Sequence, residues 1–165
     1  MRSAIIVIVT CLAGITQLPA QKILKSATLE AKLEQATRIS ETNPPKAISI
    51  LNEVISKALK KKRPDLVSRS YAILGDIYHN INQHELAIER YMQSLHHLEQ
   101  HKTEFNPTYN YLKAELYLKI GETHLHLKDY PAAEGAFHSG IALTKDSTQL
   151  LLLHEGILEL SLIHI

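Results

Sequence analysis

The 165-residue sequence has no tryptophan, a single cysteine, and only six glycines and six prolines. With one cysteine the chain forms no internal disulfide and no cysteine-based metal site. Its scarce helix-breaking residues, set among abundant Leu, Ile, Ala, Glu, Lys and Gln, favour helix over sheet. These shortages exclude a disulfide-stabilised scaffold and predict an all-α chain.

The sequence also lacks an excess of charge of either sign, since it contains 18 basic and 17 acidic residues. This balance gives no electrostatic footprint for nucleic-acid binding. A composition of 45% hydrophobic and 21% charged residues is typical of a folded protein. The length suits one domain and is too short for two sizeable ones.

The first 20 residues have the layout of a secretory signal peptide. Arg2 precedes an apolar run from Ala4 to Ile15, and Ala20 offers a small residue for cleavage. The run is too short to cross a bilayer, which takes about 20 apolar residues. A chain exported in this way would be periplasmic or secreted, and cleavage near Ala20 would remove its only cysteine. An uncleaved anchor or a cytosolic leader is the alternative.

Two segments resemble one another around a glycine, Gly75 in one and Gly121 in the other. Each glycine is preceded by an aromatic residue and an aliphatic one, and is followed by an alanine, an aromatic residue and a small residue at the same distances. The matched pairs are Tyr71 and Tyr117, Leu74 and Ile120, Ala87 and Ala133, Tyr91 and Phe137, and Ser94 and Gly140. This agreement indicates an internal repeat.

The spacings predict a helix–turn–helix hairpin in each unit. Offsets of three, four and seven place residues on one helical face, and turn-prone residues separate the two faces at 80–84 and 128–131. A glycine inside a helix is destabilising by ~1 kcal/mol relative to alanine. We therefore expect Gly75 and Gly121 to make room for the partner helix, which would present Ala87 or Ala133 there.

Three repeats and a final helix account for most of the mature chain, residues 21–165. The repeats are expected at about 28–62, 65–102 and 107–145, and the final helix at 147–163. The first repeat lacks the glycine and the aromatic residues, and terminal repeats are often atypical. The wide spacing of the two glycines predicts lengthened helices at 84–102 and 107–127.

The final helix is apolar on nearly every side, with four consecutive leucines at 150–153. The last helix of a repeat array is normally polar on its outer face. Either this helix docks on a partner, or the chain is a fragment of a longer protein. The second interpretation is favoured.

These matched residues resemble the tetratricopeptide repeat family over roughly residues 29–163. The resemblance implies a right-handed α-solenoid of antiparallel helix hairpins, in which the first helix of each hairpin lines a concave groove. The lengthened repeat is similar to those of bacterial regulators, including the exported sensory regions of some histidine kinases. Two positions depart from the pattern, because His124 stands where the earlier unit has Tyr78, and Gln35 stands where a glycine is expected.

Mapped onto this chain, the resemblance implies a groove that binds a protein or peptide. Its partner-binding residues would be Arg69, Asp76, His79, Asn80, Glu115, Leu118, Glu122 and His126. Because Asp76 and Glu122 are acidic, this groove favours a basic or neutral segment. The expected function is an exported scaffold for protein–protein interaction. The alternative is the sensory input region of a membrane-bound bacterial signalling protein, in which case the membrane contact would come only from a missing downstream segment.

Ten histidines raise the question of a metal site. His97 and His101 have the spacing that lets two imidazoles share an ion, but no third ligand is identifiable, and a solvated helix face is favoured. The basic run 60–63 is expected to complement a helix C-terminus. No nucleophile elbow, phosphate-binding glycine loop or carboxylate pair is recognisable. We therefore expect no catalytic residue, no cofactor and no metal, and a protein that is not an enzyme.

Overall fold

The computed structural model describes residues 28–100 and 107–163, and every regular element in these ranges is a helix. A helix over residues 28–39 comes first. It is followed by α2 (Pro44–Lys60), α3 (Pro64–Asn80), α4 (His84–Glu99), α5 (Pro107–His126), α6 (Tyr130–Ile141) and α7 (Ser147–Ile163). The all-α prediction is confirmed. The predicted signal peptide lies outside the described residues.

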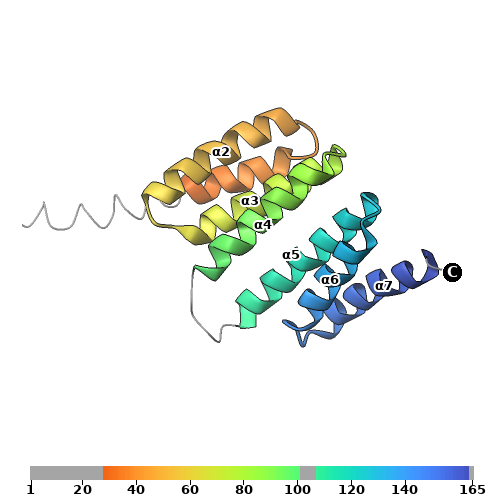
Figure 1. Ribbon diagram of the computed structural model, residues 1–165. Helices are drawn as coiled ribbons and strands as arrows, with labels where there is room; N and C mark the ends of the chain where they lie inside the picture. Colours follow the sequence, from red (N-terminus) through yellow and green to blue (C-terminus); the bar gives the residue numbers. More distant parts are fainter. Residues whose placement is uncertain (1–27, 101–106, 164–165) are drawn as a thin grey trace, which may run out of the picture.

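Helices that follow one another in sequence pack side by side. The closest packing joins α3 to α4 and α5 to α6, while α2 lies on α3, α4 on α5, and α7 on both α6 and α5. Figure 1 shows the helices arranged in chain order from α2 to α7. No helix in the described residues is long and apolar enough to cross a membrane.

Three of the turns between helices share one backbone geometry. Lys62, Asn82 and Lys128 each have a φ between 52° and 60°, which is the left-handed region. The residue after each donates its backbone N–H to a carbonyl five residues earlier, at 2.8–3.0 Å. This is the Schellman pattern, which satisfies the last carbonyls of a helix as the chain turns. Asn82 and Lys128 each follow their repeat glycine by seven residues, so the repeat predicted around Gly75 and Gly121 extends to the turns.

Each repeat glycine makes room for an aromatic ring of the next helix. A Cβ on Gly75 would lie 2.3 Å from Cε1 of Tyr91, and a Cβ on Gly121 would lie 2.3 Å from Cε1 of Phe137. The expectation that Ala87 or Ala133 would fill this space was therefore wrong. Both alanines are fully buried, but a ring needs far more room than a methyl group, and it is the ring that requires glycine.

The predicted helix 84–102 is also too long, because α4 ends at Glu99. After Leu98, which is buried, the sequence continues with Glu99, Gln100, His101 and Lys102. These residues offer no apolar side chain whose burial would stabilise another turn. Of the two helices predicted to be lengthened, α5 is the longer one, with 20 residues against 16 in α4.

We expect Gly121→Leu to lower the free energy of unfolding by ~1–3 kcal/mol, because the new side chain would overlap the Phe137 ring. Gly135 is the matched control, since it lies on α6 with no atom within 4 Å of a Cβ built there. Gly135→Ala should raise stability by up to ~1 kcal/mol, because alanine is the better helix former. Thermal unfolding of both variants checks this, and an unchanged melting temperature for Gly121→Leu would contradict the packing.

Candidate binding pocket between α3, α4 and α5

A cavity of about 460 Å³ lies where α3, α4 and α5 meet, and we call it the α3–α5 pocket. Apolar side chains form much of its wall, among them Ala72, Ile73, Leu98, Leu112 and Leu116. Charged residues also line it, namely Asp65, Arg69, Asp76, Glu115 and Lys119. Its volume and its mixture of apolar wall with a few polar groups are those of ligand-binding sites in general.

The eight residues predicted to line a groove separate into those that line this pocket and those that do not. Arg69, Asp76 and Glu115 line it. His79 and His126 form a separate cluster, described below, and Asn80 is exposed at the end of α3.

The last two predicted residues of the groove also lie outside the pocket lining. Leu118 packs against the apolar cluster of Phe137 and Leu153, because a residue three before Gly121 shares the glycine's side of α5. Glu122 interacts electrostatically with Glu159 of α7.

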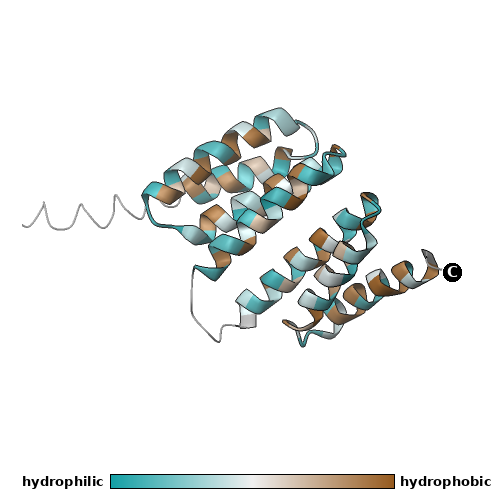
Figure 2. Ribbon diagram, viewed as in Figure 1, coloured by the Kyte–Doolittle hydropathy of each residue, from teal (hydrophilic) through white to brown (hydrophobic). Residues whose placement is uncertain are grey.

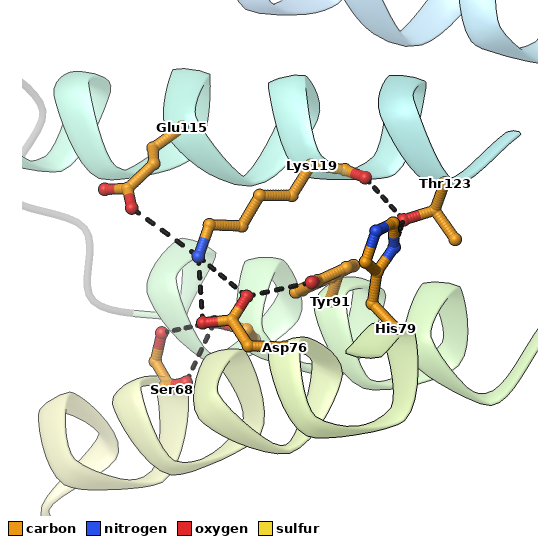
Figure 3. Close-up of polar contacts among 8 residues, drawn as sticks. Ser68, Asp76, His79, Tyr91, Glu115, Lys119 and Thr123 are labelled. Atoms are coloured by element: carbon orange, nitrogen blue, oxygen red, sulfur yellow. Dashed lines mark hydrogen bonds and ion pairs between the residues drawn. The ribbon is translucent and has the colours of Figure 1, made fainter. Parts of the chain in front are cut away.

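Asp76 is the centre of a polar network that joins three helices (Figure 3). The Nζ atom of Lys119 donates to both of its carboxylate oxygens, at 2.7 and 2.9 Å, and so connects α5 to α3. The Tyr91 hydroxyl donates to Oδ1 at 2.8 Å and so connects α4 to α3. Glu115, one turn before Lys119, lies 3.7 Å from the same Nζ. Asp76 is thus already paired within the protein.

The network keeps the Tyr91 hydroxyl protonated. Burial raises the pKa of Tyr91 well above its ordinary value, and the Asp76 carboxylate acts in the same direction because it accepts a hydrogen bond from the hydroxyl group.

Sequence reasoning missed the role of Lys119. Its spacing of four from Glu115 was a visible signal, but its pairing with Asp76 depends on how α5 lies against α3.

Two buried hydroxyl groups close the side of the pocket between α3 and α4. Ser94 donates to the backbone carbonyl of Ser68 at 2.9 Å, and the two hydroxyl oxygens are 2.9 Å apart. Both side chains are almost fully buried. A larger residue at position 94 would separate the helices, which explains the small residue at this repeat position.

Three imidazoles from three helices lie together beside the polar network of Asp76. The ring centroids of His79, His84 and His126 are 4.9–5.2 Å apart. His79 Nδ1 lies 3.0 Å from the Thr123 hydroxyl, which itself donates to the carbonyl of Lys119. Because that hydroxyl has only one proton, Nδ1–H of His79 is the donor in this contact.

Burial lowers the pKa of His79 below its ordinary value, and the neighbouring His126 and His84 lower it further. Asp76 opposes the shift, whereas Lys119 adds to it. The rings do not form a metal site, since those of His84 and His126 stack with their planes only 7° apart. Among the described residues, no group of three or more His, Cys, Asp or Glu side chains is placed to hold a metal ion.

The second histidine of the predicted helix-face pair, His101, lies outside the described residues. Its neighbour His97 stacks on Tyr71, with ring centroids 5.6 Å apart and planes 8° apart. His97 therefore contributes to the packing of α4 on α3.

No family model, no curated protein and no solved structure matches this chain.

We expect the His79 ring to titrate below pH ~6.5, the value of histidine in an unfolded chain. The unfolded state then takes up a proton first as the pH falls, so the contribution of His79 to stability is greatest above pH ~6.5 and declines below it. NMR titration of the ring protons measures this directly. His126→Gln removes a neighbour that lowers the pKa, and should therefore raise the midpoint of His79. A midpoint at or above ~6.5, or one unmoved by His126→Gln, would contradict the assigned environment.

Proposed function

We propose that this chain is an exported tetratricopeptide-type scaffold that binds a partner polypeptide in the α3–α5 pocket. In this proposal the hairpins form a right-handed α-solenoid, and α3 and α5 line its concave side. The observation that carries the proposal is the pocket itself, an apolar-walled cavity of about 460 Å³ between successive hairpins. The shared turn geometry at Asn82 and Lys128 and the shared ring-on-glycine packing support a repeat architecture.

The pocket favours an apolar side chain as the partner's main anchor. Ile73, Leu98 and Leu112 offer apolar wall, whereas Asp76 is neutralised by Lys119. The expectation of a basic or neutral partner rested on Asp76 and Glu122. At this pocket Asp76 is paired with Lys119 and Glu122 is not part of the lining, so neither favours a basic partner here. Arg69 has no ion-pair or hydrogen-bond partner among the described residues and stands at the pocket wall. It would suit an acceptor group beside the apolar anchor.

We assign no reaction to this site. Apart from Arg69, the main polar groups of the pocket pair with one another, as Ser68 does with Ser94 and Asp76 with Lys119. A catalytic site instead needs a nucleophile or a base directed at a substrate. Such pairing suits a rigid binding surface.

Site-specific photo-crosslinking tests the pocket. A benzophenone amino acid at position 108, an exposed residue on the pocket lining, should give a discrete adduct with a partner protein. The same group at Ser56, exposed on α2, should give none. Unlabelled wild-type chain should compete for the adduct, whereas unlabelled Ala72→Arg chain should not, because it fills the pocket with a charged side chain. Equal adducts from both positions, or no adduct at position 108, would exclude the pocket as the binding site.

The export half of the proposal has its own test. If the leader is removed after Ala20, the chain recovered from the exported fraction of its host should begin at Gln21. N-terminal sequencing measures this. A mature chain that retains Met1 to Ala20 would contradict export through a cleaved signal peptide.

A further inference from the structure

The helix α7 buries one face and exposes three leucines on the opposite face. Its inward face is buried on α5 and α6 through Gln149, Leu153, Gly156 and Leu160. On the outward face, Leu151 is 60% exposed, Leu158 61% and Leu162 72%. Spacings of seven and four place these three leucines in one line along the helix, and Glu155, four residues after Leu151, lies in the same line. Figure 2 shows hydrophobic residues along the whole of α7.

The register of the repeat shows that this exposure is exceptional. Leu151 is five residues before Gly156, and Leu158 is two after it. The residues at the same distances from Gly75 and Gly121 are all buried, with at most 5% of their surface exposed. They are Ser70 and Ile77 on α3, and Leu116 and Thr123 on α5. Positions that the earlier repeats bury are therefore open on α7.

This exposure arises from the helix against which Gly156 packs. Gly75 and Gly121 receive a ring from the helix that follows them, but a Cβ on Gly156 would lie 2.5 Å from Phe137, on the helix that precedes it. The glycine-bearing face of α7 thus packs on the preceding helix α6, whereas the glycine-bearing faces of α3 and α5 pack on the helix that follows each of them. The opposite face of α7 is left without a covering helix among the described residues.

Two glutamates stand on this open face, and the basic side chains of α7 are limited to that of His154. Glu155 and Glu159 are exposed, and α7 contains neither lysine nor arginine. Burial raises the pKa of Glu122 on α5 and Glu159 acts in the same direction, whereas Lys119 and His126 act against them. A second copy of the chain would bring glutamates against glutamates, whereas a basic partner would pair with them.

We propose that the outward face of α7 binds an amphipathic helix of a partner protein. The apolar stripe of that helix packs on Leu151, Leu158 and Leu162, and its lysine or arginine side chains lie against Glu155 and Glu159. Helix-on-helix burial of this kind is a common mode of peptide recognition. It is also how α6 and α7 already pack within this chain. The surface is separate from the α3–α5 pocket, and the inference does not depend on that pocket.

Two synthetic helical peptides, each as long as α7, test this inference with the full chain. Both carry the same leucine stripe, and lysines flank it in one and glutamates in the other. In fluorescence anisotropy the lysine peptide should bind at least about ten-fold more tightly, and added salt should weaken it, because exposed charges are screened. Glu155→Lys with Glu159→Lys should reverse the preference between the two peptides.

Replacing Leu151, Leu158 and Leu162 together by glutamine should abolish binding of the lysine peptide. The fold should persist in this variant, because all three side chains are mostly exposed. Leu59→Gln and Met92→Gln are matched controls, since both side chains are about half exposed on other helices, at 50% and 52%. Circular dichroism checks that each variant is folded.

Three outcomes would overturn the inference. They are equal binding of the two peptides, unchanged binding by the triple variant, and a dimer of the wild-type chain that the triple variant loses while neither peptide binds. The last would identify a second copy as the occupant. Failure here would leave crosslinking from position 108 unaffected, so the two proposals fail independently.

Discussion

The packing of an aromatic ring into the space left by a glycine determines how these helices pair. Tyr91 occupies the space at Gly75, and Phe137 occupies the space at Gly121. In both cases a Cβ would overlap the ring, so the close approach of the two helices depends on glycine. The two rings differ by one hydroxyl group, and the surfaces beside the two hairpins differ accordingly.

The hydroxyl of Tyr91 connects packing to the candidate binding site. It donates to Asp76, and Asp76 binds Lys119 of the next hairpin, so one ring both closes α3 on α4 and fixes a wall of the α3–α5 pocket. Phe137 has no such group. Its ring instead lies between two glycines, Gly121 and Gly156, and so attaches α7 to α6 without a polar contact at the ring. The same repeat position thus produces a polar junction in one unit and an apolar one in the next.

Sequence patterns predicted the helices well, because burial on one face imposes a regular spacing that is visible along the chain. They predicted less about how one helix is rotated against another. Leu118, which they placed in the groove, packs against the apolar cluster of Phe137 and Leu153 and does not line the α3–α5 pocket, and Lys119 was missed. The cluster of His79, His84 and His126 draws on three helices, and no local spacing could reveal it. The open face of α7 likewise follows from rotation, since Gly156 sits in the repeat register but faces the preceding helix.

Contacts between ring protons and glycine protons, measured as nuclear Overhauser effects, test the ring-on-glycine packing most directly. With glycine and phenylalanine selectively labelled, the Phe137 ring should show contacts to the Hα protons of both Gly121 and Gly156. The ring current should also shift those glycine protons from their usual positions. Ring contacts confined to residues of α6, with neither glycine shifted, would contradict the account of how the hairpins and α7 are held together.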